Sequence, residues 1–346
     1  MLHLVSSIQS LILITEKVLV MILTPLNKKE FESVLKNYSI GRYLSHKHLV
    51  KAVQNTVYVL NTTQGQFVLK VFELIDQVIV QYQFKIINYL AKKNMPVQKF
   101  IHNKNGEVIS LYKHKPLTIE TFLKGKSLKK PSNVLLRNTA RTLGKLDRYL
   151  LHLTLQGKYT WGKEHLFKNQ IISKKCVIAG INIKEAERKL LPEMNSIDRD
   201  KLRKSVIHSD FRDCNVLVKN NRIIAILDWG DCHEDYLAYE LAVTTANLVA
   251  DQQITKRNMQ LFFAEYQKYV QLRKEEQKAT YYFIKRRFIA VILWFTKQMR
   301  YHKDLRTSLA KTRLKIIQGY IWFSNISLAE FLDLFHPEKA FKKKSL

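Results

Sequence analysis

The chain has 346 residues, of which 46% are hydrophobic and 25% charged, with only 10 glycines and 6 prolines. This composition excludes collagen-like, low-complexity and wholly disordered chains, and the length suffices for one large two-lobed domain or two ordinary ones. The 58 Lys and Arg residues exceed the 29 Asp and Glu residues, which gives a formal charge of +29. We therefore expect an anionic partner, and the candidates are nucleic acid, an acidic membrane surface and a nucleoside triphosphate. A lysine-rich proteome whose charges are solvated would give the same excess of positive charge.

The amino-terminal residues 1–24 are largely apolar, but Glu16 and Lys17 interrupt them and no cleavage site of small residues follows. A membrane span needs about 18 or more uninterrupted apolar residues. We therefore expect neither a membrane span nor a secretory signal, and we interpret residues 1–20 as an upstream start-codon extension or a loosely attached arm. The cysteines are too few and too scattered to stabilise a secreted scaffold, which predicts a cytoplasmic protein: Cys176, Cys214 and Cys232.

The first third of the chain predicts a small β-rich region. Residues 27–37 read as a short helix and residues 39–53 as an extended segment. Two β-rich runs at 56–60 and 66–72 flank the turn sequence NTTQG, which predicts a hairpin.

Apolar residues then recur at intervals of three and four over 75–93, which predicts an amphipathic helix. A second hairpin is expected from 99–101 and 108–112 around the turn sequence NKNG, followed by a strand at 117–123.

The rest of the chain is dominated by helical periodicity, at 132–157, at 183–203 and across 238–335. One small β hairpin interrupts it, with strands at 216–218 and 223–227 joined by Asn220 and Asn221. We predict an α+β fold with a small β-rich N-lobe at 21–123 and a larger, mainly helical C-lobe at 124–346. The apolar run 288–295 lies within the helical part and is expected to be core rather than a membrane-surface segment.

The residues with the clearest chemical pattern surround this β hairpin. His208 and Asp210 are followed by Asn215 before the hairpin, and by the sequence Asp228-Trp229-Gly230 after it. Phosphoryl transfer needs a carboxylate beside the attacking hydroxyl and oxygen ligands for the magnesium that neutralises the phosphates. A loop anchored by a hairpin can bring Asp210, Asn215 and Asp228 together, and the last two supply the oxygen ligands that Mg²⁺ prefers.

This segment resembles the aminoglycoside phosphotransferase and choline kinase superfamily, whose fold resembles that of the protein kinases. Within this group the chain is most similar to the bacterial homoserine kinases of the phosphotransferase type, over roughly residues 21–300. The resemblance extends to TPLNKKEF, QNTVYVLNTTQGQFVLKVFE, MPVQKFIHNKNGE and KPLTIETFLKGKSL, upstream of the core sequence. It implies a protein-kinase-like two-lobed fold and an ATP- and Mg-dependent kinase of a small alcohol.

The resemblance also implies roles for individual residues of the C-lobe. Asp210 would be the catalytic base or hydroxyl-orienting carboxylate, and Asn215 and Asp228 would hold Mg²⁺. His208 would support the catalytic loop, with the carboxylate of Glu240 as its partner.

In the N-lobe, the resemblance implies that Lys70 contacts the α and β phosphates of ATP. Residues 54–58 would form the loop over the triphosphate, where Asn55 offers donors. Adenine would meet the backbone of the segment that ends the N-lobe: Glu120, Thr121, Phe122 and Leu123.

One departure from the family pattern concerns the partner of Lys70. Relatives commonly place a Glu for this lysine on the following helix, yet residues 77–106 contain no acidic residue. Asp76, Asp228 or ATP alone remain as partners, and an inactive pseudoenzyme with a basic surface for nucleic acid or acidic partners remains an alternative. A zinc site built from His208, His233 and the nearby cysteines would not match a common four-ligand spacing.

The charge of the C-terminal region bears on the acceptor. Residues 241–346 contain 20 Lys and Arg but only 8 Asp and Glu, whereas a polycationic aminoglycoside needs a carboxylate-lined cleft. An acceptor with its own carboxylate, such as homoserine or another hydroxy amino acid, fits better, with Arg287 or Arg300 as its clamp. Aminoglycoside, choline or another amino alcohol remains the alternative, since three acidic residues after the magnesium pair could bind an ammonium group: Asp231, Glu234 and Asp235.

Overall fold

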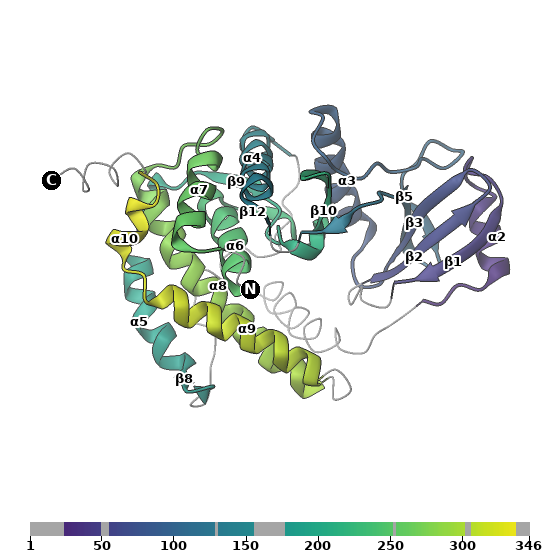
Figure 1. Cartoon of the computed structure of the whole chain (residues 1–346). Helices are drawn as coiled ribbons and strands as arrows, with labels where there is room; N and C mark the ends of the chain where they lie inside the picture. Colours follow the sequence, from purple (N-terminus) through teal and green to yellow (C-terminus); the bar gives the residue numbers. More distant parts are fainter. Residues whose placement is uncertain are drawn as a thin grey trace, which may run out of the picture. The chain divides into compact units, whose positions relative to one another are not determined.

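The structure is a computed structural model that describes residues 24–49, 55–128, 131–155, 177–251, 254–301 and 306–336. These residues form two compact units, which divide between Lys124 and Gly125 (Figure 1). Residues 1–20, interpreted above as an extension or arm, lie outside the described part of the chain. No helix in the described part is long and apolar enough to cross a membrane.

The first unit is built on a five-stranded antiparallel sheet with the order β1-β2-β3-β5-β4. Its strands are β1 (Tyr43–His48), β2 (Asn55–Thr62), β3 (Gly65–Phe72), β4 (Ser110–Tyr112) and β5 (Lys115–Thr121). The β2–β3 hairpin confirms the prediction from the two β-rich runs. Buried and partly buried residues alternate along β2, so one face of the sheet forms the core, with Leu60 and Leu69 fully buried.

Both helices predicted in this unit are present. Helix α2 (Lys28–Leu35) begins with a reciprocal capping box between Asn27 and Glu30, and it buries Phe31 against the sheet core. Helix α3 (Gln77–Lys92) begins at the N-cap Asp76, whose carboxylate accepts the N–H of Ile79 at 3.0 Å.

The second predicted hairpin is wrong. β4 pairs with β5, and the two strands are joined by Lys113 and His114, which both have positive φ angles of 49° and 64°. Two consecutive left-handed residues match the twist of a tight hairpin, a conformation for which Lys and His give no sequence signal. The NKNG sequence instead forms a loop around Asn103, whose Oδ1 accepts the N–H groups of Asn105 and Glu107.

The buried carboxylate of Glu73, directly after β3, forms several hydrogen bonds at the end of the sheet. Burial alone would raise the pKa of Glu73, but hydrogen bonds from Lys115, Thr56 and Thr24 outweigh it and lower that pKa. Lys115 Nζ lies 2.5 Å from Glu73 Oε2. Glu73 follows Lys70 by three residues, yet its carboxylate is committed to Lys115.

The second unit is mainly helical (Figure 1). Its described helices are α4 (Asn133–Leu150), α5 (Ile183–Asn195), α6 (Leu237–Ala250), α7 (Lys256–Tyr266), α8 (Lys274–Tyr301), α9 (Arg306–Ser324) and α10 (Leu328–Asp333). Helix α6 is buried on nearly every side and packs against α8 and α9. The prediction that the run 288–295 is core is confirmed, since Phe288, Ile289, Ile292 and Phe295 are buried, although Trp294 is exposed.

Short strands frame the loop that carries the candidate site. The predicted β hairpin is confirmed as β10 (Val216–Lys219) and β11 (Arg222–Ile226), joined by Asn220 and Asn221 in left-handed conformations. A strand not predicted, β6 (Lys126–Ser127), pairs antiparallel with β10 and adds a third strand to this hairpin. A second pair, β9 (Lys204–Ile207) with β12 (His233–Tyr236), was also missed.

One ion-pair network yields a stability prediction. Glu265 is almost fully buried and contacts Arg137, Arg141 and Lys268 at 2.7, 2.9 and 3.0 Å. Burial would raise the pKa of Glu265, but these cations lower it to about 2. Since this pKa lies below the unfolded value, the stabilisation is complete above about pH 4.5 and is lost as the pH falls toward 2.

We expect Glu265→Gln to lower the free energy of unfolding by about 1–2 kcal/mol at pH 7, because the cations are about half exposed and solvent screens them. The difference from the wild type should shrink as the pH falls toward 2. Urea unfolding across this pH range measures it. A difference that stays constant with pH would contradict the assignment.

Candidate active site

The loop of residues 208–215 connects β9 to β10 and is organised by a buried histidine. The N–H of Asp210 donates to Nδ1 of His208 at 3.2 Å, and Nε2 lies 3.0 Å from the carbonyl oxygen of Leu227. Because Nδ1 accepts, Nε2 is the nitrogen that donates to the Leu227 carbonyl. The ring also packs edge to face on Trp229, with centroids 4.6 Å apart.

The Glu240 carboxylate supports His208 through the backbone of the loop rather than through the imidazole ring. Glu240 Oε2 accepts the N–H of Ser209 at 2.8 Å, and backbone hydrogen bonds from Ser209 and His208 counteract the rise that burial causes in the pKa of Glu240. The His208 ring itself contacts Leu227 and Asp210. Ser209 has a positive φ of 64°, which is strained for a side chain with a Cβ. The Glu240 side chain therefore supports the loop by binding the loop's backbone at Ser209, the strained residue before Asp210.

Two side chains fix the carboxylate of Asp210. Asn215 Nδ2 donates to Asp210 Oδ2 at 2.7 Å and to the Asp210 carbonyl at 3.0 Å, while Arg287 Nη2 lies 3.3 Å from Oδ1. Burial raises the pKa of Asp210, and the positive charges of Arg287 and Arg212 counteract this rise. The carboxylate is thus held in one orientation by donors on both of its oxygens.

Asn215 and Asp228 lie side by side at the base of the β10–β11 hairpin, because the Asn215 carbonyl accepts the N–H of Leu227 at 2.8 Å. The Asn215 amide nitrogen is used by Asp210, so its Oδ1 is the atom that can bind a cation. Asp228 is exposed and has a positive φ of 60°. One amide oxygen and one carboxylate form a hard-oxygen donor set that fits Mg²⁺. Within the described ranges, no three His, Cys, Asp or Glu side chains are placed to share a metal ion.

The three acidic residues after this pair differ in their surroundings. Burial, together with the charges of Asp210 and Asp228, raises the pKa of Asp231 to about 6. Asp235 is engaged within β12, where it contacts His233 Nε2 at 3.2 Å and accepts the N–H of Tyr236 at 2.6 Å. Glu234 is exposed on the same strand. Of these three acidic residues, Asp231 is the one whose pKa responds to the charge of Asp210.

In the first unit, Lys70 lies on β3 with its Nζ 4.8 Å from the centre of the Phe72 ring. The nearby acids are committed elsewhere, Asp76 to the cap of α3 and Glu73 to Lys115. No described acidic residue of this unit forms an ion pair with Lys70.

The other residues predicted to contact ATP lie at strand ends. Asn55 was expected in a loop, but it begins β2 and pairs with Phe72, because the hairpin extends further than its β-rich core; residues 50–54 lie outside the described part. Glu120 and Thr121 end β5, and the N–H of Thr121 already donates to the Lys99 carbonyl at 2.8 Å. Phe122 and Leu123 follow the strand and are half-buried.

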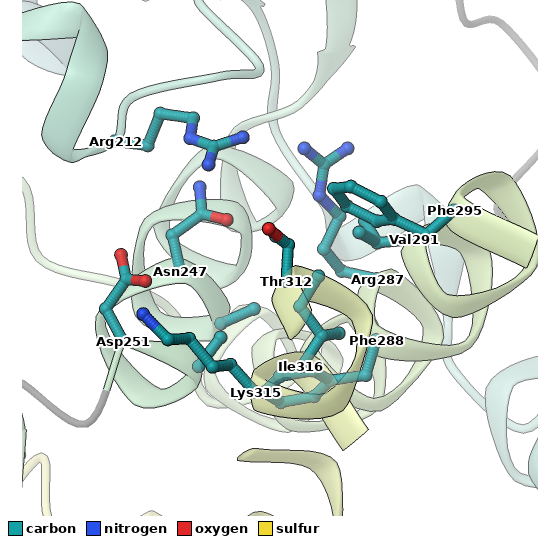
Figure 2. Close-up of a pocket in the computed structure, with 12 residues that line it drawn as sticks. Arg212, Asn247, Asp251, Arg287, Phe288, Val291, Phe295, Thr312, Lys315 and Ile316 are labelled. Atoms are coloured by element: carbon teal, nitrogen blue, oxygen red, sulfur yellow. The ribbon is translucent and has the colours of Figure 1, made fainter. Parts of the chain in front are cut away.

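A pocket in the helical unit begins beside the Asp210 loop (Figure 2). Arg287 lines it and contacts Asp210, so one of the two predicted clamps lies at the site. Arg300 is exposed and lies about 20 Å further along α8 at 1.5 Å per residue; it is not a lining residue. Sequence reasoning missed two lining residues, Arg212 and Asn247. The signal for Arg212 was its position two residues after Asp210, and Asn247 had no such signal.

Similar solved structures share this fold at low sequence identity. An amicoumacin kinase, hAmiN, in complex with AMP-PNP, Ca²⁺ and Ami matches with a TM-score of 0.66 and 13% identity over 85% of this chain and 94% of that one. A choline/ethanolamine kinase family protein from Mesorhizobium loti matches with a TM-score of 0.59 and 13% identity over 87% of this chain and 94% of that one. The fold is that of the protein-kinase-like phosphotransferases, as predicted, with a β-rich unit and a mainly helical one.

Sequence comparison identifies the family of the chain. The sequence model of the phosphotransferase enzyme family matches residues 48–274, so the chain belongs to this family and is a kinase. A homoserine kinase of Zymomonas mobilis subsp. mobilis is 26% identical over 237 residues, covering 66% of this chain and 73% of that protein. A homoserine kinase of Caulobacter vibrioides is also 26% identical over 237 residues, covering 64% and 71%.

Proposed function

We propose that this kinase transfers the γ-phosphoryl group of ATP to the hydroxyl of homoserine or a similar hydroxy amino acid, with Mg²⁺ as cofactor. The observation that carries the proposal is the Asp210 carboxylate, held by Asn215 and Arg287 at the edge of a pocket rich in N–H donors. The similarity to homoserine kinases supports this acceptor class, as does the shortage of carboxylates in residues 241–346.

Asp210 orients the acceptor hydroxyl and accepts its proton as the oxygen attacks the γ-phosphorus in line. Its fixed orientation supports this role, because a carboxylate held by Asn215 and Arg287 needs no reorganisation before the proton moves. His208 positions the loop through its bond to the Asp210 N–H.

Asn215 Oδ1 and the Asp228 carboxylate are the proposed magnesium ligands. When bound, Mg²⁺ neutralises charge on the phosphate oxygens. Lys70 binds phosphate through its ammonium group, which lies 4.8 Å from the centre of the Phe72 ring. The backbone of residues 120–123 binds adenine, chiefly through Phe122 and Leu123, since the Thr121 N–H is already used.

The test is an assay of ADP release with Mg-ATP and a panel of acceptors: homoserine, hydroxylysine, choline, ethanolamine and kanamycin. We expect turnover to be highest with homoserine or another hydroxy amino acid and to require Mg²⁺. Phosphorus NMR of the product identifies the phosphate ester. A preference for kanamycin or choline would overturn the acceptor class, and ATP binding without turnover of any acceptor would favour the pseudoenzyme.

A further inference from the structure

The pocket beside Asp210 is formed by the loop residue Arg212 and by helices α6, α8 and α9 (Figure 2). The pocket is open to solvent. In Figure 2 the lower side chains are Phe288, Ile316 and Lys315, and the guanidinium groups of Arg212 and Arg287 lie above them. The residues used below are Arg212, Asn247, Asp251, Arg287, Phe288 and Ile316.

Buried N–H donors without partners gather at this pocket. Arg212 Nε, Asn247 Nδ2 and Arg287 Nε have no hydrogen-bond partner among the described residues. Arg212 Nε is 3.8 Å from the Asp213 carboxylate, which is beyond hydrogen-bond distance. Buried donors are almost always paired in folded proteins. Three such donors around one pocket therefore indicate that a bound ligand supplies the acceptor oxygens.

The arrangement of these donors indicates the charge of the ligand. In Figure 2 the amide nitrogen of Asn247 points toward the guanidinium group of Arg212, so an acceptor near both would receive hydrogen bonds from each. Two guanidinium groups and one amide favour a carboxylate, which accepts several hydrogen bonds at once. Asp251, at the edge of the same pocket, lies near the positive charges of Arg212 and Lys315.

The position of Arg287 connects the pocket to the reacting centre. Its Nη2 contacts Asp210 at 3.3 Å, while its Nε is one of the unpaired donors of the pocket wall. A ligand whose hydroxyl meets Asp210 can therefore place a carboxylate on the donors, with its short aliphatic chain near Phe288 and Ile316. A small hydroxy amino acid has these three parts.

We propose that this pocket is the subsite for the acceptor's carboxylate, which Arg212 and Asn247 bind directly and Arg287 orients toward Asp210. The inference rests on the proposed function and deepens it, because it names the groups that select a carboxylate-bearing acceptor over an amino alcohol.

The test compares homoserine with 3-amino-1-propanol, the same molecule without its carboxylate. We expect the ratio of the two kcat/KM values to fall about 10- to 100-fold in Arg212→Met, because the lost bond is charge-assisted. In Asn247→Asp we expect a similar fall through a higher KM for homoserine, since the new carboxylate repels that of the acceptor. Because Arg212 also lowers the pKa of Asp210, its loss acts on the kcat/KM of both acceptors alike, and their ratio removes this shared effect. The KM for ATP should change less than about threefold, within the range of a surface substitution.

Lys311→Met provides the matched control, because Lys311 is exposed on α9 outside the pocket. The ratio should not change in this variant. Where turnover of 3-amino-1-propanol is too slow to measure, its inhibition constant against homoserine replaces its kcat/KM.

The outcomes separate this inference from the proposed function. If the wild type phosphorylates no hydroxy amino acid, the proposed function fails and this inference fails with it. If homoserine is phosphorylated and the ratio stays at the wild-type value in both Arg212→Met and Asn247→Asp, the subsite is overturned while the function stands. If Arg212→Met does not fold, the isosteric Asn247→Asp decides alone.

Discussion

Replacing Asp210 by asparagine should lower kcat for phosphoryl transfer by about 10²- to 10⁴-fold, the contribution typical of a general base. Asparagine has nearly the same shape, but it cannot accept a proton at neutral pH. Its amide nitrogen would also face Asn215 Nδ2 or Arg287 Nη2, which both donate to the wild-type carboxylate. The rate of ADP release at saturating acceptor measures the change.

Three readouts make the Asp210 experiment specific. The KM for ATP should change little, because Asp210 is proposed to act on the acceptor. The matched control is Asp200→Asn, which alters an exposed carboxylate elsewhere in the helical unit and should leave kcat within about twofold. An Asp210→Asn variant that keeps more than a tenth of the wild-type kcat, with a normal melting temperature, would remove Asp210 from the catalytic role.

The largest expected effect on stability comes from Arg286→Met. Arg286 and Glu187 form an ion pair between α8 and α5, and their side chains are only 2% and 5% exposed. Removing one partner leaves the other charge in a site with little access to water, which typically costs about 3–5 kcal/mol. We expect the free energy of unfolding to fall by this amount, as measured by urea denaturation.

The double variant Arg286→Met with Glu187→Leu distinguishes the lost pair from lost packing. Because a buried ion pair also carries a desolvation cost, replacing both partners by apolar residues should restore most of the stability. A double variant as unstable as Arg286→Met would show that the loss arises from packing. A single variant within about 1 kcal/mol of wild type would contradict the burial argument altogether.

Arg286 and Arg287 illustrate what a sequence cannot distinguish. Adjacent residues of an α-helix point about 100° apart, so they face different neighbours. Arg286 is held by Glu187, whereas Arg287 contacts Asp210 and the pocket. In the sequence both belong to one basic run, Lys285-Arg286-Arg287, and nothing local separates a structural arginine from a functional one.

Interactions between residues close in the chain were accessible from the sequence. The β2–β3 hairpin, helices α2 and α3 and the β10–β11 hairpin all follow from short-range periodicity and turn chemistry. The grouping of Asp210, Asn215 and Asp228 was also predictable, because the hairpin between the last two returns the chain to its starting point.

Interactions between distant segments were decided only by the tertiary structure. The β4–β5 hairpin is local, but it was missed because Lys113 and His114 carry no turn signal. The β9–β12 pairing was missed because 25 residues lie between its nearest paired residues, Ile207 and His233. The donors of the pocket come from a loop and two helices, and hydrophobic periodicity places each helix without specifying its neighbours. The sequence by itself thus determined most local elements and the grouping of the catalytic loop. Long-range packing decided which backbone groups bind Glu240, which neighbours Arg286 and Arg287 contact, and where the site proposed for the acceptor lies.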